Sequence, residues 1–545
     1  MGSQIRSAII LTGLWVLVVA VALVVRPPLP VDETRYLAVA WDMWLEGHYL
    51  VPYLNGEPYS HKPPLLFWLM TAGWHAFGVN EWWPRLVAPL FGLGSMLFTM
   101  RLARVLWPDR PEVPGLAPLL LFACSFWALF TTLTMFDMML AFFALAALIA
   151  LVMAARTGRW RGFLAAGIAI GLGVLAKGPA ILLHYLPVAL TAPWWLPALA
   201  GEAAKPRWGR WYGGVALSVV VAATVGLAWA VPAGISGGEA YRNAIFWGQS
   251  AGRVVDSFAH ARPFWWYAAV IPGLVLPLLV WPPLWRAFAR LGRAFGDGGV
   301  RLTLVWMGAA FVVFSLVSGK QLHYLLPEFP ALALLAAYLM SRSDAASGAQ
   351  VRRRDLALPG ILLLVAGAAL IALPHLEVGG RLGQMAGEGR FGLAGLLVIF
   401  AAGVMRLAAA DRVGQAGRLA LAVAVLVCAV HVAFSSVLYA RYDLTPIARE
   451  IKAYEDAGKR VANVGKYHGQ YHYLGRLTKP VPAIGLVDGD MQAYFAAHPD
   501  GYAVAYYKNL PKTPEPLSTF RFRNLTAVFW PVAVLKAHPG LEDRQ

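Results

Sequence analysis

The amino-acid sequence predicts a mainly α-helical, polytopic membrane protein with a small α/β domain at its C-terminal end. Of its 545 residues, 59% are hydrophobic and only 14% are charged. A soluble chain of this size cannot hide so much apolar area, because its surface-to-volume ratio limits the buried fraction. The apolar residues also gather in runs of roughly 20, the length that crosses a bilayer. These observations exclude a soluble enzyme and a disordered chain.

The formal net charge of +17 is explained by membrane topology and does not indicate nucleic-acid binding. Lys and Arg stand in blocks between the apolar runs, as they do in cytoplasmic loops that fix orientation. We therefore expect no nucleic-acid partner. The two cysteines, Cys124 and Cys428, lie inside apolar runs and predict neither a disulfide nor a metal site.

Residues 1–438 are expected to form the membrane domain, with about thirteen spanning helices. The predicted spans are 8–25, 83–106, 116–133, 138–155, 162–176, 179–199, 211–232, 264–285, 302–318, 323–340, 356–374, 391–410 and 418–438. With the N-terminus in the cytoplasm, every predicted inward loop contains at least three Lys or Arg residues, the bias that sets topology. An odd number of spans then places the C-terminal domain outside.

Three outer segments are too long to be simple turns. Residues 27–82 contain an amphipathic stretch at 32–46, ended by Gly47, that is expected to lie in the interface plane. Residues 233–263 form the second long outer loop. Residues 439–545 change in composition and predict a small α/β domain outside the membrane. Its expected elements are helices at 445–457 and 488–497 and strands at 460–464 and 502–506.

Three lysines in outward segments share a local context. Lys62 and Lys177 precede a proline that favours a helix start, and Lys320 follows Gly319 just before a predicted span. Free backbone N–H groups and the positive end of the helix dipole, with a lysine beside them, suit a phosphate. The competing interpretation is that each lysine extends to the lipid headgroups. Three lysines on one face favour an anion site.

Acidic residues on the same face are few. Asp32 and Glu33 begin the in-plane stretch, and Asp137 lies in a tight outer turn. A carboxylate at such a position fits two roles: capping a helix, or acting as a general base or binding a cation. Arg35 and Tyr36 follow Asp32 by three and four residues, so in a helix they share its face.

Five short elements occur in a recognisable order along the chain. They are Asp32-Glu33-Thr34-Arg35-Tyr36, Lys62-Pro63-Pro64, Asp137, Lys177-Gly178, and Ser318-Gly319-Lys320 with Tyr324. This series resembles the GT-C membrane glycosyltransferases of the protein mannosyltransferase superfamily, and within them the lipid A aminoarabinose transferases. The resemblance covers the whole membrane part and implies a GT-C fold.

The resemblance implies a set of site residues. Asp32 and Asp137 match acidic positions with catalytic roles. The carrier phosphate is expected to be held by Lys62, Arg253 and Tyr324, with Lys320 and Lys177 from the helix-start argument. Further substrate contacts are expected from Glu33, Arg35, Tyr36 and His61. No cofactor is required, and if a divalent metal takes part, His61 and Asp137 are the residues expected to hold it.

The implied reaction is transfer of 4-amino-4-deoxy-L-arabinose from undecaprenyl phosphate to lipid A or a related envelope acceptor. It would occur with inversion at the periplasmic face of a bacterial inner membrane, where it modifies lipopolysaccharide and confers polymyxin resistance. His61 stands where this branch has Glu, and Gln321-Leu322-His323 replaces Leu-Pro-Thr. A protein O-mannosyltransferase-like enzyme, or another polyprenyl-phosphate-sugar transferase, therefore stays open. A flippase or transporter is disfavoured, because its polar groups would lie near mid-membrane.

Overall fold

The computed structural model describes residues 2–200, 207–248, 261–342, 351–376, 380–406, 411–511 and 513–541. The chain forms two compact units. Unit 1 comprises Met1–Val24, Ser60–Leu66 and Arg85–Ala433, and unit 2 comprises Val25–Tyr59, Phe67–Pro84 and Phe434–Gln545. Arg253 falls outside the described residues, so its predicted contact with a phosphate stays a prediction.

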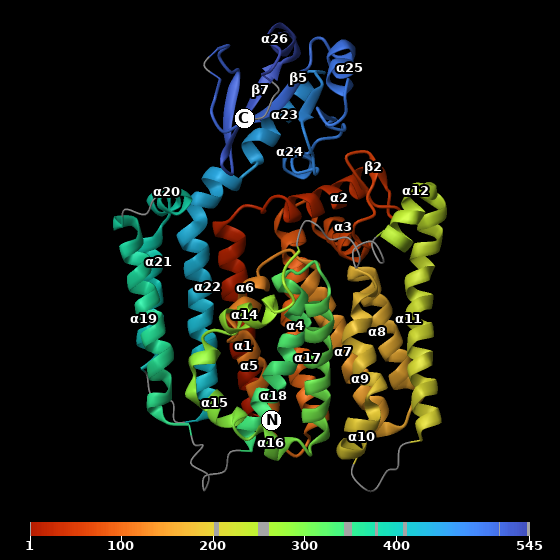
Figure 1. Cartoon of the computed structure of the whole chain (residues 1–545), viewed down its shortest axis with the longest axis vertical. Coiled ribbons are helices and arrows are strands. Elements are labelled where there is room, and N and C mark those ends of the chain that lie inside the picture. The colour runs from red at the N-terminus through yellow and green to blue at the C-terminus, as the bar shows by residue number, and fades with distance from the viewer. Residues whose placement is uncertain are drawn as a thin grey trace. The chain divides into compact units, whose positions relative to one another are not determined.

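Unit 1 is a helical bundle whose longer helices run mostly side by side (Figure 1). Its first helices are α1 (Gly2–Val25), α4 (Trp82–Leu106), α5 (Val113–Phe122), α6 (Ser125–Phe130), α7 (Phe136–Thr157), α8 (Trp160–Lys177), η1 (Pro179–Ile181), α9 (Leu182–Leu190), α10 (Ala192–Ala200), α11 (Trp208–Ser236), α12 (Gly238–Asn243) and η2 (Ala244–Gly248). They are followed by α14 (Trp266–Leu274), η4 (Leu278–Val280), α15 (Pro282–Phe288), α16 (Leu291–Ala294), α17 (Gly298–Leu316), η5 (Leu322–Glu328), α18 (Phe329–Ser341), η7 (Arg353–Leu356), α19 (Ala357–Ala372), η8 (Leu373–His375), α20 (Gly380–Glu388), α21 (Phe391–Met405) and α22 (Arg412–Tyr442).

Within the described residues, nine helical segments are long and apolar enough to cross a membrane. The chain is therefore a multi-pass membrane protein with the predicted mainly α fold. The four other predicted spans are shorter helices or helices in pieces. They are 116–133, 179–199, 264–285 and 391–410.

Two of the broken segments satisfy each other's backbone groups. Helices α5 and α6 are separated at Cys124, where the backbone is extended. The amide of Ser125 donates to the carbonyl of Leu276 at 2.9 Å, and Cys124 forms a β-bridge with Pro277. Inside a bilayer such pairing replaces the missing helical hydrogen bonds. The hydropathy of the sequence shows the apolar run but not this exchange of partners.

Glycines let neighbouring helices of unit 1 approach closely. A Cβ atom on Gly395 of α21 would lie 2.5 Å from the carbonyl oxygen of Gly367 on α19, and one on Gly367 would lie 2.8 Å from the carbonyl of Gly395. On α8, a Cβ at Gly171 would lie 2.5 Å from Val225 of α11. Small residues at such crossings are how membrane helices gain packing without a hydrophobic driving force.

Unit 2 joins the first outer loop to the C-terminal domain. The outer loop contributes α2 (Asp32–Glu46), the hairpin β1 (Tyr53–Leu54) and β2 (Glu57–Pro58), and most of α3 (Leu65–Phe77). The C-terminal domain contains α23 (Thr445–Asp456), β3 (Val461–Val464), α24 (His472–Gly475), β4 (Ala483–Ile484), α25 (Asp490–Ala497), β5 (Tyr502–Tyr507), β6 (Ser518–Phe522), β7 (Leu525–Pro531) and α26 (Val532–Ala537).

The C-terminal sheet has the strand order β4-β3-β5-β7-β6, with β3 parallel to β4 and β5, and β7 antiparallel to β5 and β6. Alternate residues of β5 and β7 enter two apolar cores, because side chains alternate across a strand. Val504 and Phe529 pack with α23, whereas Ala505 and Trp530 pack with α25 and α26. The predicted helices at 445–457 and 488–497 and strands at 460–464 and 502–506 are all present.

Specific contacts hold the outer loop and the C-terminal domain together as one unit. The indole of Trp41 on α2 donates to the carbonyl of Leu477 at 2.9 Å. The ring of Trp74 stacks on Tyr473 at 5.4 Å. Asn55 both donates to and accepts from the backbone of Val481, at 3.0 and 2.7 Å. The division of the chain at residue 438 stays a prediction, and the structure groups α2 and α3 with the residues beyond it.

Candidate active site

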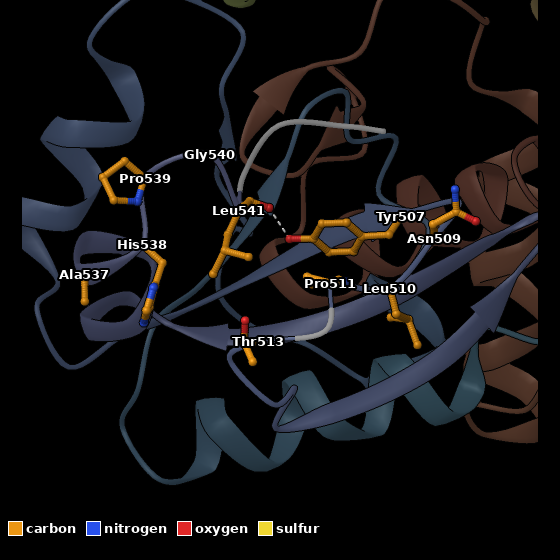
Figure 2. A pocket seen from close by; sticks show the side chains of 10 residues that line it. All are labelled: Tyr507, Asn509, Leu510, Pro511, Thr513, Ala537, His538, Pro539, Gly540 and Leu541. Atoms are coloured by element: carbon orange, nitrogen blue, oxygen red, sulfur yellow. Dashed lines mark hydrogen bonds between the residues drawn. The ribbon is translucent and has the colours of Figure 1, made fainter.

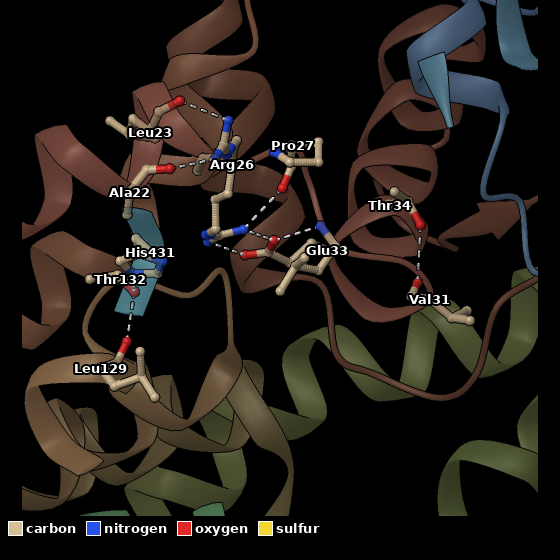
Figure 3. A network of polar contacts seen from close by, with 12 residues as sticks. Ala22, Leu23, Arg26, Pro27, Val31, Glu33, Thr34, Leu129, Thr132 and His431 are labelled. Atoms are coloured by element: carbon tan, nitrogen blue, oxygen red, sulfur yellow. Dashed lines mark hydrogen bonds and ion pairs between the residues drawn. The ribbon is translucent and has the colours of Figure 1, made fainter. Parts of the chain in front are cut away.

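The chain between α1 and α2 is fixed by a buried ion pair in unit 2. Arg26 and Glu33 are both nearly inaccessible, with side-chain exposures of 1% and 4%. Arg26 Nη2 donates to Glu33 Oε1 at 2.9 Å, and the amide of Leu29 donates to Glu33 Oε2 at 2.8 Å (Figure 3). Both oxygens of Glu33 are thus used in folding the turn. A contact between Glu33 and substrate stays a prediction.

Asp32 stands at the first position of α2 and is half exposed. The helix runs from Asp32 to Glu46 and ends at Gly47, whose φ of +72° is a left-handed conformation that glycine adopts readily. The predicted in-plane helix therefore has the predicted bounds. The N-cap is Val31, so Asp32 does not cap the helix. The capping interpretation of Asp32 is wrong, and its carboxylate is available for another role.

Arg35 and Tyr36 share the face of Asp32, as the spacing predicts. Arg35 forms an ion pair with Asp32, and the Tyr36 hydroxyl lies 3.5 Å from Asp32 Oδ1. The Asp32 side chain is nevertheless 53% exposed, against 20% for Arg35. This arrangement orients an accessible carboxylate with a cation and a phenol beside it.

A second cluster lies in unit 1, around Asp137. Asp137 is in the first turn of α7 and forms an ion pair with Lys177, the last residue of α8. The ammonium of Lys177 also lies 5.2 Å from the centre of the Tyr324 ring. Gly178, with a φ of +83°, ends α8 immediately after this lysine. Pro179 begins the next helical segment, η1 followed by α9, so the predicted helix start after Lys177 is present. The charge of Lys177 is balanced by Asp137, and its binding of the carrier phosphate stays a prediction.

Lys62 and His323 belong to the same cluster. Lys62 Nζ lies 5.8 Å from the centre of the Phe136 ring, next to Asp137 in sequence, and both Lys62 and His323 act electrostatically on Asp137. Unit 1 thus brings together Lys62, Asp137, Lys177 and Tyr324, four of the predicted site residues. Two lysines, Lys62 and Lys177, thus act electrostatically on the carboxylate of Asp137.

Lys320 is buried and ties two segments of unit 1 together. Its ammonium donates to the carbonyl of Arg262 at 3.0 Å and also to that of Val317. A β-bridge between Ala261 and Gly319 joins the same segments. These contacts give Lys320 a structural role, and its binding of the carrier phosphate stays a prediction. His61 is exposed beside Lys62.

The described residues contain no cluster of three or more His, Cys, Asp or Glu side chains that could hold a metal. Asp137, one of the two residues expected to bind a metal, already accepts from Lys177. Metal dependence therefore stays a prediction.

A buried pair that the sequence reasoning missed lies near Tyr324. His184 of α9 and Glu328, the last residue of η5, form a hydrogen-bonded pair in the interior of unit 1. Tyr324 and Glu328 both belong to η5, so the pair holds the segment that carries the tyrosine. The sequence signal that could have revealed this pair is an ionisable residue inside a predicted span. Placing such a residue in the membrane is energetically unfavourable unless it is paired.

The C-terminal domain contains a cavity of about 580 Å³ (Figure 2). Ten residues line it, among them Tyr507, Asn509, Thr513, His538 and Leu541. The Tyr507 hydroxyl donates to the carbonyl of Leu541 across this region. None of the predicted site residues lines this cavity.

Comparisons with known proteins identify sequences and structures that this chain resembles. Residues 61–229 match the family model described as dolichyl-phosphate-mannose-protein mannosyltransferase. The undecaprenyl phosphate-alpha-4-amino-4-deoxy-L-arabinose arabinosyl transferase of Pseudomonas paraeruginosa (strain DSM 24068 / PA7) is 31% identical over 353 residues, 63% of this chain and 60% of the relative. A second relative is the undecaprenyl phosphate-alpha-4-amino-4-deoxy-L-arabinose arabinosyl transferase 2 of Pseudomonas fluorescens (strain Pf0-1). It is 29% identical over 357 residues, 64% of this chain and 61% of the relative. The chain thus spans less than two thirds of the length of these relatives.

The similarity in structure extends further than the similarity in sequence. The crystal structure of ArnT from Cupriavidus metallidurans bound to undecaprenyl phosphate matches with a TM-score of 0.74 at 19% identity, covering 100% of this chain and 99% of that chain. The apo structure of the same protein matches with a TM-score of 0.73 at 21% identity, covering 95% and 98%. The chain has the GT-C fold. Its resemblance to the aminoarabinose transferases, predicted from five short elements, is confirmed.

Proposed function

We propose that this chain is a glycosyltransferase that moves 4-amino-4-deoxy-L-arabinose from undecaprenyl phosphate to lipid A or a related envelope acceptor. The observation that carries the proposal is the match over the full chain to a protein crystallised with undecaprenyl phosphate. The names of the curated relatives support the sugar. The two lysines that act on Asp137, Lys62 and Lys177, are side chains that suit a phosphate.

The reaction is displacement at the anomeric carbon of the donor. The bond from this carbon to the carrier oxygen breaks, and negative charge develops on the leaving phosphate. Lys62 and Tyr324 would stabilise that charge, with Arg253, since fixed donors in a water-poor site stabilise developing charge without reorganising. Neither a cofactor nor a metal is required in this scheme. The Asp137–Lys177 pair would hold the Tyr324 ring through the contact of Lys177 with it.

The role of Asp32 depends on the acceptor. If the acceptor is a hydroxyl, Asp32 takes its proton as general base, and a single direct attack inverts the anomeric configuration. If the acceptor is a phosphate oxygen, no proton need be removed, and Asp32 positions the sugar or the acceptor. Its half-exposed carboxylate, oriented by Arg35, fits either role.

The proposed location is the bacterial inner membrane, with the N-terminus in the cytoplasm and the C-terminal domain in the periplasm. The distribution of Lys and Arg among the loops supports this orientation. The donor and acceptor would then be consumed at the periplasmic face.

The second candidate function is transfer of another sugar, or transfer to another acceptor such as a protein. The family model that matches residues 61–229 is described as a protein mannosyltransferase, which favours this alternative over unrelated chemistries. Mass spectrometry of lipid A and of other envelope glycans, with and without the gene, tests both. Loss of aminoarabinose from lipid A on deletion is the expected result. Unchanged lipid A with an altered glycoprotein or glycan would support the alternative.

A further inference from the structure

We infer that the C-terminal domain supplies a phosphate-binding subsite for the acceptor beside Asp32. The subsite consists of Arg35 on α2, Lys466 in the loop after β3, and Arg523 in the turn between β6 and β7, all in unit 2. The inference rests on the proposed function, since it concerns the second substrate of that reaction. It assigns the domain a role in recognising an anionic headgroup.

The topology of the sheet brings Lys466 and Arg523 to one edge. Strands β3 and β5 are parallel, so their C-terminal ends share an edge, and Lys466 follows the end of β3. Strand β7 is antiparallel to β5, with Thr526 opposite Tyr507 at the C-terminal end of β5. The turn that precedes β7 and contains Arg523 therefore reaches the same edge.

This edge packs against the start of α2. Gly469, in the loop that carries Lys466, has a φ of +69°, and a Cβ atom there would lie 2.4 Å from Leu54 and 3.2 Å from Ala38 of α2. Arg523 Nη2 donates to the carbonyl of Pro30 at 3.3 Å, two residues before Asp32. Contacts with two separate parts of the domain thus hold its edge at the beginning of α2.

The charges at this edge are mostly positive. Arg35, Lys466 and Arg523 all act electrostatically on His468, and Asp32 is the carboxylate that acts on it. Burial and these three cations lower the pKa of His468, so its imidazole is neutral at pH 7. Three positive charges therefore face one negative charge. A phosphate would complete the balance and accept charge-assisted hydrogen bonds.

The subsite is held in place by hydrogen bonds within the domain. In the loop, the amide of His468 donates to Gln470 Oε1 at 2.8 Å, and Asn463 Nδ2 donates to the carbonyl of Gly465 at 3.0 Å. In the turn, the amide of Arg523 donates to the carbonyl of Arg441 at 2.7 Å. Arg35 is itself held by its ion pair with Asp32.

The phosphate bound at this subsite is better assigned to the acceptor than to the undecaprenyl carrier. The carrier phosphate ends a long isoprenoid chain, which must remain in the bilayer, and the cation proposed for it is Lys62 of unit 1. Lys466 and Arg523 belong instead to a folded α/β domain outside the spanning segments. A glycolipid headgroup that displays its own phosphate can reach such a domain.

Steady-state kinetics on the purified full chain in lipid nanodiscs test the inference. In the double variant Lys466→Gln/Arg523→Gln, the KM for a bisphosphorylated lipid A acceptor should rise about tenfold or more. Each lost contact is a charge-assisted hydrogen bond, which contributes more binding free energy than a neutral one. The KM for the undecaprenyl phosphate-linked donor should change less than about twofold, because the donor is held elsewhere. Arg460→Gln is the matched control, since it removes an exposed cation at the opposite end of β3 and should leave both constants unchanged.

Two further arms separate the explanations. The single variants Arg523→Gln and Arg523→Lys are compared for acceptor affinity. Arg523→Lys keeps the charge but loses the guanidinium bond to Pro30, so it should retain most of the affinity that Arg523→Gln loses. An equal loss in both variants would indicate a structural role and contradict the inference. Direct titration with a bisphosphorylated and a dephosphorylated headgroup needs no turnover. If the wild type fails to transfer the sugar, the proposed function is contradicted. If the wild type and the double variant bind the phosphorylated headgroup equally well, the proposed subsite is contradicted. A rise in donor KM alone would reassign these cations to the carrier and contradict the inference.

Discussion

At the scale of single residues, Asp32 is the side chain on which the proposed mechanism depends most. Its carboxylate is half exposed and oriented by Arg35. We expect Asp32→Asn to lower kcat by at least about 100-fold, the usual range for losing general acid–base catalysis. The protein should keep its melting temperature, because the residue is accessible and does not cap its helix. Activity within a few-fold of wild type would remove both the base and the positioning role.

Glu33, its neighbour, is expected to behave in the opposite way. Its buried carboxylate pairs with Arg26 and accepts the amide of Leu29. Glu33→Gln leaves the Arg26 charge buried without its partner, which typically costs about 3–5 kcal/mol. The apparent melting temperature should therefore fall clearly. Glu57→Gln, at an exposed position in the same unit, is the control and should be neutral. A stable Glu33→Gln protein with an altered KM would instead restore Glu33 as a substrate contact.

At the scale of helices and strands, a pair of glycines allows α19 and α21 to approach closely. A side chain at Gly395 would collide with the carbonyl of Gly367, so Gly395→Leu should force the helices apart and cost about 1–3 kcal/mol. Gly392→Leu on the same helix is the matched control, because a Cβ there meets nothing within 4 Å. Thermal unfolding in detergent compares the two. Equal stability would show that this crossing is not a tight contact.

The sequence predicts elements well where local signals decide them. Helix α2 has the predicted bounds because an amphipathic face and Gly47 define it. Hydropathy alone does not predict the structure of residues 116–133. The helix is interrupted at Cys124, where the backbone pairs with Pro277. The helix start after Lys177 was predicted correctly, because Pro179 opens η1 and α9. The ion pair of Lys177 with Asp137 was not predicted, since it joins residues that are distant in the sequence.

At the scale of the whole molecule, the grouping of α2 with the C-terminal domain could not be read from the sequence. It depends on contacts between distant residues, such as Trp41 with Leu477 and Asn55 with Val481, that leave no periodic signal. Candidate site residues were easier to find, because ionisable side chains at the ends of apolar runs stand out. Lys466 and Arg523, which we propose for the acceptor, do not stand out in this way because they lie in an ordinary polar domain.

The proposed orientation makes a prediction about the same domain. Asp488 is exposed, so Asp488→Cys should react with a membrane-impermeant thiol reagent added to the periplasmic side. Arg159→Cys, in a predicted inward loop, should react only after the membrane is opened. The background should be low because Cys124 and Cys428 are buried. The reverse pattern would invert the topology.

Reconstitution of the purified chain with synthetic undecaprenyl phosphate-aminoarabinose and lipid A tests the central proposal most directly. Mass spectrometry should detect lipid A carrying the added sugar, together with released undecaprenyl phosphate. Lys62→Ala should need about tenfold more donor for the same rate, since one charge-assisted contact to the carrier phosphate is lost. An intact donor and unmodified lipid A, with a wild-type protein that is folded and binds undecaprenyl phosphate, would contradict the account.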